Sequence, residues 1–589
     1  MALGVLSTSA APSQPVLRRL LRYLRPFRRT LAIALGLLLL ATLTDVAQPF
    51  VIKTFINRDL IPRHFAFADL WLLGVGYLGL IIASAGLNVG QLFLFQQVAL
   101  AIVRQLREDV FQHVLDLSMP VLDRTPVGVL VSRITNDTEA ILQMFMTVLS
   151  TVVQNVTVLL GILAAMLWLD RRLGLEFILV LPIVGAIIAV YRRVSGPVFH
   201  QAREYLARLN ALLNESLAGM ALIQAMGQEG RMRDSFHAIN EAYRRARLKN
   251  TRINALLLRP LMEVIYTLAI IWLLASFGVR GPGAINIGIL YAFLTYLGRV
   301  FEPINGLMQR LNFFQQAMVS AERVFELMDE PDTRPQAIDG DGQITAGHIE
   351  LEHIWFRYGE GPFILKDISM NIPPGATAAI VGPTGSGKSS LMNLLMRFYL
   401  PTEGVIRIDG QPLERFSDRE LRSKMTWVLQ DPFIFVGDIL FNIRLGDDIG
   451  EAEAVQAARL VQADSFIRAL PEGYHTPLGE RGATLSAGQR QLLSFARAMA
   501  RQPVILILDE ATAHVDSETE SAIQQALRTM RKGRTTVMIA HRLSTVVDAD
   551  IIYVLHQGAI VEQGTHESLM ARQGRYYAMF QSQDSGLPD

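Results

Sequence analysis

Hydrophobic positions gather in six long runs in the first part of the chain. They cover residues 31–56, 70–93, 147–169, 173–191, 255–277 and 287–308. A helix of about 20 mostly apolar residues crosses the hydrocarbon core of a bilayer. The pattern therefore predicts a transmembrane domain over residues 1–328 with six spans. An even number of spans leaves both ends of this domain on one side of the membrane.

The segments between the runs differ in length and charge. Residues 57–66, 170–172 and 278–286 are short, whereas residues 94–146 and 192–254 are long and rich in arginine. Arginine-rich loops remain on the cytoplasmic side, which places the long loops and both termini there. The long loops also keep a helical apolar period. We therefore expect the spanning helices to continue well beyond the membrane, towards the second half of the chain.

The pattern changes after Met328. Residues 329–347 are rich in proline, glycine and aspartate, which is typical of a linker. From residue 348 to 589, short apolar strands alternate with helical segments, which indicates an α/β domain with a largely parallel sheet. The expected fold is therefore multi-domain: a six-helix α transmembrane domain with long intracellular helices, fused to a soluble α/β domain.

The composition agrees with a membrane protein that has a soluble half. Of its 589 residues, 51% are hydrophobic and 19% charged, and the mean hydropathy is +0.29. The chain has no cysteine, which excludes disulfides, thiolate metal ligands and cysteine nucleophiles. Six arginines lie between residues 18 and 29, and no acidic residue precedes Asp45. We interpret this segment as a cytoplasmic amphipathic elbow, with an organellar transit peptide as the alternative.

A phosphate-binding loop lies at "GPTGSGKSS", between an apolar strand and a helical segment. Its glycines would let backbone N–H groups face phosphate oxygens, Lys388 would reach the β- and γ-phosphates, and the Ser389 hydroxyl would bind Mg²⁺. The expected ATP-binding residues of this loop are Gly382, Pro383, Thr384, Gly385, Ser386, Gly387, Lys388, Ser389 and Ser390. ATP and Mg²⁺ are the expected cofactors.

Two acidic residues end the apolar run "VILILDE", residues 504–510. A fully apolar run suits a central parallel strand, and ligands bind at the carboxyl ends of such strands. Asp509 would hold Mg²⁺, and Glu510 would act as the general base on the attacking water. The alternative is that the two acids cap the following helix.

The second half resembles an ATP-binding-cassette (ABC) ATPase. The helix start "LSAGQ" is similar to the signature motif of that family, and "GERG", residues 479–482, to its cross-domain loop. The resemblance implies that Tyr358 stacks on adenine, that Gln430 contacts Mg²⁺ and the attacking water, and that His541 contacts the γ-phosphate. It also implies that Asp516 lies in a dimer-contact loop. The residues expected to contact a partner's ATP are Leu485, Ser486, Ala487, Gly488 and Gln489.

The whole chain resembles an ABC exporter half-transporter (type IV fold). Within that class it is similar to the B-type subunit of the bacterial multidrug-resistance-like (Mdl/Smd) heterodimeric pairs, on "LLRP", "LYAFLTYLGR", "ERVFELMD" and "LHQGAIVEQGTH". The resemblance implies ATP-driven export of hydrophobic or amphipathic compounds by alternating access, in a dimer of half-transporters. It places the protein in the bacterial inner membrane among its lipids, with both termini and the ATP-binding domain in the cytoplasm.

Two departures from the family pattern bear on the partner. Ala487 replaces the first glycine of the signature, and His514 stands where a small residue is usual. An added methyl group at Ala487 would crowd the approach of backbone to phosphate. This change favours a heterodimer in which one composite site is weaker. A homodimer with two working sites remains open.

The cargo is the least determined feature. Asp45 and Glu263 lie within predicted spans, where burying a charge costs about 2.5–3.5 kcal/mol. They are candidates for attracting cationic cargo, with helix–helix polar bonds as the alternative. A lipid or glycolipid flippase is the rival function. A soluble ATPase acting on nucleic acid is disfavoured by the six spans, and a regulator that binds ATP without hydrolysis by the intact Glu510 and His541.

Overall fold

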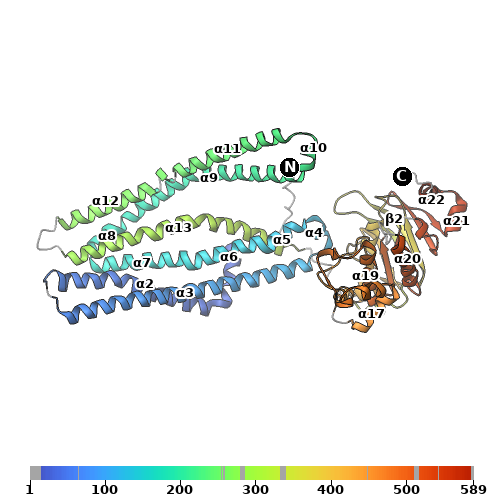
Figure 1. Ribbon diagram of the computed structural model, residues 1–589, viewed down its shortest axis with the longest axis horizontal. Coiled ribbons are helices and arrows are strands. Elements are labelled where there is room, and N and C mark those ends of the chain that lie inside the picture. Colours follow the sequence, from blue (N-terminus) through green and yellow to red (C-terminus); the bar gives the residue numbers. More distant parts are fainter. Residues whose placement is uncertain are drawn as a thin grey trace. The chain divides into compact units, whose positions relative to one another are not determined.

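The computed structural model describes residues 15–63, 65–253, 255–256, 259–278, 286–331, 340–446, 449–509, 517–540 and 543–584. The chain forms two compact units (Figure 1). The first contains residues 1–115 and 127–330. The second contains residues 331–589 together with the short segment 116–126, which interrupts the first unit in sequence.

The first unit is helical. Its helices are α1 (Val16–Tyr23), α2 (Arg28–Phe55), α3 (Phe67–Asp116), α5 (Val127–Ser132), α6 (Thr138–Thr147), α7 (Val153–Leu169), α8 (Arg171–Ile178), α9 (Val180–Ala218), α10 (Met220–Ala225), α11 (Glu229–Ile253), α12 (Arg259–Gly278) and α13 (Ile287–Met328). Helix α3 has 50 residues and α13 has 42, against about 20 needed to cross a membrane. The helices therefore continue beyond the apolar runs, as the apolar period of the long loops predicted.

Five stretches of described helix, rather than the six predicted, are long and apolar enough to cross a membrane. They are Val16–Leu60, Phe67–Asp116, Val127–Leu169, Arg171–Ala218 and Pro260–Phe277. The predicted sixth run, 287–308, forms the start of α13, but its apolar helical part within the described residues is only Ile287–Val300. Its shortness explains why length and hydropathy do not establish a sixth span.

Helix α13 is central to the packing of the first unit. It packs against α2, α6, α7 and α12, and its buried Phe293, Tyr296 and Leu297 lie in a core with residues of the neighbouring helices. Helices α9 and α11 pack along each other as a long hairpin closed by α10 (Figure 1). Many large apolar side chains of the long helices remain exposed, including Leu179, Ile183 and Val190 of the stretch Arg171–Ala218, as expected for helices that face lipid.

The second unit contains two main sheets. One has the order β2-β1-β4-β5 and the other the order β12-β11-β3-β10-β9-β6. The strands are β1 (Ile349–Phe356), β2 (Leu365–Ile372), β3 (Thr377–Val381), β4 (Glu403–Ile408), β5 (Gln411–Pro412), β6 (Met425–Val428), β7 (Gly437–Asp438), β8 (Pro477–Leu478), β9 (Ile505–Asp509), β10 (Thr535–Ile539), β11 (Ile551–His556) and β12 (Ala559–Gly564). In the six-stranded sheet only β11 and β12 pair antiparallel, so the predicted largely parallel sheet is present.

Helices surround these sheets. They are α4 (Met119–Arg124), α14 (Lys388–Leu395), α15 (Asp418–Lys424), α16 (Ile439–Arg444), α17 (Glu451–Leu460), α18 (Asp464–Ala469), α19 (Ala487–Ala500), α20 (Ser517–Arg531), α21 (His566–Arg572) and α22 (Arg575–Asp584). Along β3, Ala379 and Val381 face one hydrophobic core, whereas Ala378 and Ile380 face another. Side chains alternate between the faces of a strand. Both faces of the sheet are therefore buried, and the fully apolar sequence of β3 follows from this.

Candidate nucleotide-binding site

The register of the parallel strands brings three predicted motifs to one edge of the sheet. Strand β10 pairs with β3 and with β9, and Ile539 lies opposite both Ile380 and Asp509. Strand β6 pairs with β9, with Val428 opposite Leu508. The phosphate-binding loop, Asp509 and the segment that carries Gln430 therefore leave the sheet at the same carboxyl edge, where ligands bind in such sheets.

Two glycines determine how the loop turns from β3 into α14. Gly387 precedes the helix with φ of +104°, in the left-handed region that glycine adopts without strain. At Gly382, a Cβ atom would lie 2.2 Å from the carbonyl oxygen of Leu555 in β11. The loop can therefore follow this path only with glycine at both positions.

Lys388 and Ser386 supply polar groups beneath the loop. Lys388 is buried, and its Nζ donates to the carbonyl oxygens of Gly382 at 2.7 Å and Pro383 at 3.0 Å. The buried Ser386 Oγ has no hydrogen-bond partner among the described residues, which normally carries a free-energy cost. A cationic lysine, an unpaired hydroxyl and a helix N-terminus together fit an anionic phosphate chain.

An aromatic cluster lies beside the start of α14. The Tyr358 hydroxyl donates to Ser390 Oγ at 3.1 Å. The ring of Tyr358 makes edge contacts with Phe356, at 4.8 Å between centroids, and with Tyr399, at 4.9 Å. Tyr358 is 36% exposed, so part of its ring remains available to a ligand next to the phosphate-binding loop.

A hydrogen bond connects this cluster to the segment 116–126. The Tyr399 hydroxyl donates to Asp123 Oδ2 in α4 at 2.6 Å. Burial and this bond to the carboxylate raise the pKa of Tyr399, so the phenol remains a donor at neutral pH. The sequence alone did not indicate either residue, because the two are 276 positions apart.

The remaining predicted catalytic and metal-binding residues are only partly described. Asp509 ends β9, and Ser389 and Gln430 are exposed. Glu510, Asp516 and His541 lie outside the described residues. Their assigned roles therefore rest on the sequence, while Asp509, Ser389 and Gln430 lie on elements that end or begin at the carboxyl edge of the sheet.

The signature segment begins α19. Ser486 Oγ accepts from the N–H of Gln489 at 3.2 Å, and Gln489 Oε1 accepts from the N–H of Ser486 at 3.0 Å. This is a capping box, in which two side chains satisfy two backbone donors of the helix start. Ser486 and Ala487 are both exposed, whereas Leu485 and Gly488 are buried. The segment therefore forms a capped helix start whose first residues are exposed on the surface of the second unit.

Asp45, a candidate cargo residue, takes part in a polar network between predicted spans. Its Oδ1 accepts from Gln48 Nε2 at 3.3 Å and from the Ser84 hydroxyl in α3. Arg299 in α13 donates to the backbone carbonyl of Asp45 at 2.8 Å and to Gln48 Oε1 at 3.0 Å. These contacts correspond to the helix–helix alternative. Glu263, by contrast, is exposed on α12.

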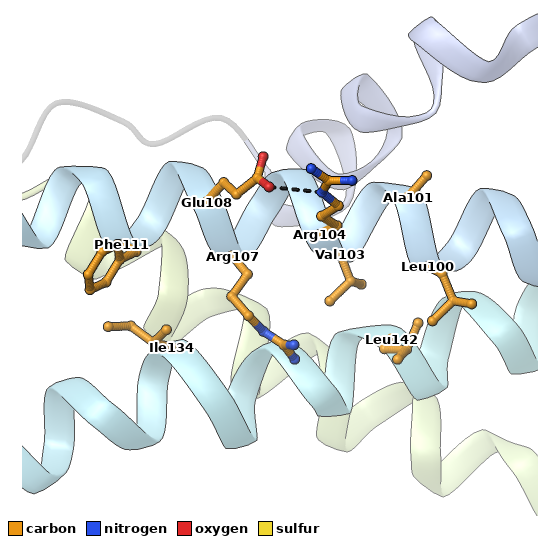
Figure 2. A pocket seen from close by; sticks show the side chains of 9 residues that line it. All are labelled: Leu100, Ala101, Val103, Arg104, Arg107, Glu108, Phe111, Ile134 and Leu142. Carbon is orange, nitrogen blue, oxygen red and sulfur yellow. Dashed lines mark hydrogen bonds and ion pairs between the residues drawn. The ribbon is translucent and has the colours of Figure 1, made fainter. Parts of the chain in front are cut away.

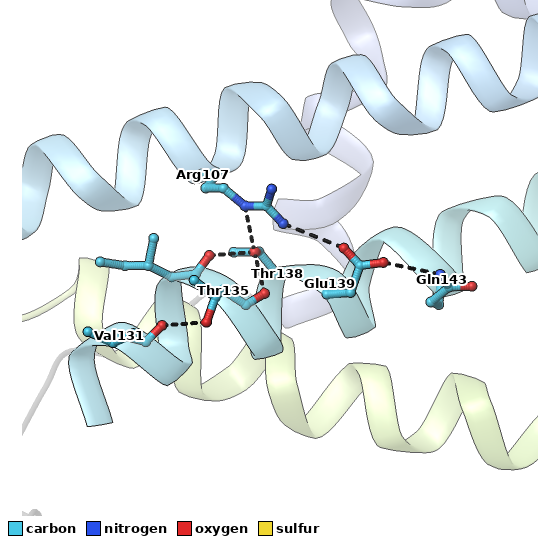
Figure 3. A network of polar contacts seen from close by, with 7 residues as sticks. Arg107, Val131, Thr135, Thr138, Glu139 and Gln143 are labelled. Atoms are coloured by element: carbon cyan, nitrogen blue, oxygen red, sulfur yellow. Dashed lines mark hydrogen bonds and ion pairs between the residues drawn. The ribbon is translucent and has the colours of Figure 1, made fainter. Parts of the chain in front are cut away.

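A cavity of about 700 Å³ lies in the first unit, between α3 and the segment that leads into α6 (Figure 2). It is lined by Leu100, Ala101, Val103, Arg104, Arg107, Glu108, Phe111, Ile134 and Leu142. Arg104 pairs with Glu108 at 2.9 Å, and Arg107 lies 3.6 Å from Glu139 and donates to Thr138 (Figure 3). Each of its two arginines therefore lies beside a carboxylate. The rest of the lining is apolar, so the cavity has no unbalanced charge that would select ions.

A nucleotide-binding sheet and several membrane-crossing helices on one chain define an ATP-dependent membrane transporter. Family models agree: residues 31–304 match the ABC transporter transmembrane region, and residues 365–513 match the ABC transporter family. The chain belongs to the ABC transporter family, as an exporter half-transporter that carries one transmembrane region and one ATPase. Its ATPase domain hydrolyses ATP in a manner coupled to transport, and half-transporters of this class act as dimers.

Three known proteins illustrate the similarity. The chain is 43% identical over 511 residues to "Probable multidrug resistance ABC transporter ATP-binding/permease protein YheH" of Bacillus subtilis, covering 86% of this chain and 76% of that one. It is 37% identical to the "Multidrug resistance-like ATP-binding protein MdlB" of Buchnera aphidicola, covering 97% and 98%. The structure of a bacterial Atm1-family ABC exporter with ATP bound superposes with a TM-score of 0.77 at 28% identity, covering 94% and 98%.

Proposed function

We propose that this half-transporter exports hydrophobic or amphipathic compounds of the multidrug type, by alternating access driven by ATP. The observation that carries the proposal is the phosphate cradle formed by Gly382, Gly387 and Lys388, on a chain that also carries apolar helices long enough to span a membrane. The multidrug names of two relatives support this class of cargo. A lipid or glycolipid cargo is the competing outcome.

The predicted residues of the nucleotide site have distinct roles in this proposal. Backbone N–H groups of the loop and Lys388 bind the phosphates, and Tyr358 stacks on the adenine. Ser389, Gln430 and Asp509 would hold Mg²⁺, which screens the charge that develops on the phosphates. Glu510 would accept the proton of the attacking water, and His541 would contact the γ-phosphate.

The signature segment supports a dimer in which each chain completes the site of the other. Ser486 and Ala487 are exposed at a helix N-terminus that carries no neighbouring lysine. Backbone donors at such a position attract anions. We infer that Leu485–Gln489 contact ATP bound to the loop of a second half-transporter, and that Asp516 lies in the contact between the two.

Ala487 supports a paralogue as that second chain, as in the heterodimeric Mdl/Smd pairs. The methyl group of Ala487 would lie where the backbone approaches phosphate, which weakens the composite site on the partner's ATP. The chain described here would then be the B-type subunit. A homodimer is the competing outcome, and it requires that the composite sites tolerate the methyl group.

The membrane arrangement follows from the same comparison. We propose that α13 provides the sixth span and that residues 1–328, 329–347 and 348–589 act as the transmembrane domain, linker and ATP-binding domain. The protein would reside in a bacterial inner membrane, with both termini and the ATPase in the cytoplasm. Of the two candidate cargo residues, Glu263 is the better one, because it is exposed, whereas Asp45 is hydrogen-bonded between helices.

The test is transport and ATP hydrolysis by the purified chain in proteoliposomes, alone and with its paralogue. We expect efflux of cationic dyes that requires ATP, and a loss of hydrolysis of about 10²–10⁴-fold in Glu510→Gln, since this is the contribution of a general base. Vigorous hydrolysis by the chain alone, lost in Glu510→Gln, excludes an obligate heterodimer. Lipid flipping without dye efflux reassigns the cargo to lipids.

A further inference from the structure

The short helix α1 has three different faces. Leu20 is buried against the first unit, while Leu17 and Leu21 are 45% and 52% exposed. The exposed arginines of α1, of the turn that follows it and of the start of α2 are Arg18, Arg22, Arg25, Arg28 and Arg29. A helix with an exposed apolar edge next to a basic edge is the pattern of a helix that lies in a membrane interface.

The position of α1 in the chain places it at a membrane surface. Only residues 24–27 separate it from α2, which forms the apolar part of the first span. Six arginines between residues 18 and 29 are accompanied by no acidic residue before Asp45. A basic cluster next to a span, with five of its six arginines exposed, attracts anionic lipid headgroups within about a Debye length of the surface. The charge of this face therefore matches one partner, an anionic leaflet.

The buried side of α1 is attached to two long helices. Arg19 Nη1 lies 2.5 Å from Asp329 Oδ2, and its guanidinium lies 4.1 Å from the ring centroid of Phe325 in α13. The Tyr23 hydroxyl donates to Asp109 Oδ2 in α3 at 2.9 Å. We call these three contacts the α1 clamp. The clamp holds α1 to both α3 and the end of α13.

The clamp contacts the end of α13, just before the chain leads into the ATPase. Asp329 is the residue that follows the last turn of α13, and the chain then passes through residues 332–339 into the ATPase. A change in the position of α1 alters its contacts with the ends of α3 and α13. A ligand that binds α1 more tightly in one position than in another increases the population of the states in which α1 has the preferred position.

We propose that α1 binds the anionic headgroups of the adjacent leaflet and that, through the α1 clamp, the anionic lipid content of the membrane sets the rate of ATP hydrolysis. This concerns the regulation of the proposed export cycle and rests on it. The apolar edge of α1 inserts between lipids, and the arginines contact headgroup phosphates or carboxylates. Through the clamp, a change in the position of α1 reaches α13.

The test measures ATP hydrolysis by the full chain, with its dimer partner, in nanodiscs of phosphatidylcholine with increasing phosphatidylglycerol. We expect hydrolysis to rise several-fold with phosphatidylglycerol and the rise to shrink at high salt. The triple variant Arg18→Gln, Arg22→Gln, Arg25→Gln should lose the response. A matched control removes three exposed arginines of the second unit, Arg415→Gln, Arg419→Gln and Arg572→Gln, and should keep it. Equal responses in the triple variant and the wild type overturn the proposal.

A second measurement separates membrane contact from its transmission. Because the chain has no cysteine, Leu21→Cys provides a single site for a nitroxide label. We expect the label to move from water into the interface as phosphatidylglycerol is added, and Tyr23→Phe with Asp329→Asn to keep this depth but lose the rise in hydrolysis. A label that stays in water overturns the proposal. Absence of hydrolysis in every lipid contradicts the proposed function instead, and the depth of the label still decides whether α1 contacts anionic lipid.

Discussion

Two helix starts of the second unit both offer backbone donors to an anion, yet their surroundings differ. At the start of α14, Gly387 is left-handed, Lys388 is buried, and the hydroxyl of Ser386 has no partner in the described part of the chain. At the start of α19, Ser486 and Gln489 satisfy each other in a capping box on an exposed surface. The first is built to hold a phosphate chain within its own unit. The second is a stable helix end whose charge is available to another molecule.

The largest effect expected from this difference is complementation between two inactive variants. Lys388→Ala should lower ATP hydrolysis by about 10²-fold or more, because it removes a preorganised charge from the phosphates. Ser486→Arg should lower it comparably by blocking the other helix start. If the chain forms a homodimer, mixing the two variants gives dimers in which one site has both wild-type parts, and activity should return in part. A mixture as inactive as each variant alone contradicts a homodimer in which the two starts serve different chains.

The next effect concerns the backbone of the first helix start. Gly387→Ala should weaken ATP binding, because φ is +104° and the added Cβ would lie 2.7 Å from Leu365 Cδ2. A left-handed conformation costs a residue other than glycine roughly 1–2 kcal/mol, which is about tenfold in the dissociation constant for ATP. Gly450→Ala is the control, because φ there is −69° and an added Cβ would lie 3.9 Å from Glu453 Oε2, an ordinary contact. Equal ATP affinities of the two variants would mean that the loop is not strained by a side chain.

A smaller effect is expected at the second helix start. Ala487→Gly restores the smallest residue where phosphate is expected to approach, and should raise hydrolysis by less than about tenfold, an energy near 1 kcal/mol. Glycine in place of alanine costs the helix about 0.5–1 kcal/mol, so folding should be unaffected. The rate should be measured in the dimer with the paralogue. An unchanged rate would remove Ala487 as the reason for a weaker composite site.

The smallest effect is expected at Tyr399, which connects the first helix start to α4. Tyr399→Phe keeps the ring beside Tyr358 but removes the hydrogen bond to Asp123. A hydrogen bond contributes about 1 kcal/mol net, so the apparent KM for ATP should change by less than about fivefold. Tyr399→Ala, which also removes the ring contact, should have the larger effect. The reverse order would show that the hydroxyl matters more than the packing.

Local patterns were sufficient for much of the site. The loop sequence specified a turn that needs glycine, and the apolar strand before it specified burial on both faces. The span count was less secure, since hydropathy separates five helices clearly but not the start of α13. The polar network of Asp45 was also not predictable, because Ser84 and Arg299 become its neighbours only when three helices pack together.

The sequence by itself determined the class of the protein, because the phosphate-binding loop, the signature and the apolar runs are each contiguous. Their chemistry depends on spacing within a few residues, which the chain fixes covalently. Only the tertiary structure decided which distant side chains meet: Tyr399 with Asp123, Arg19 with Asp329, and Asp45 with Ser84. Such contacts depend on how helices and strands pack, and a spacing of tens to hundreds of residues carries no local signal for them.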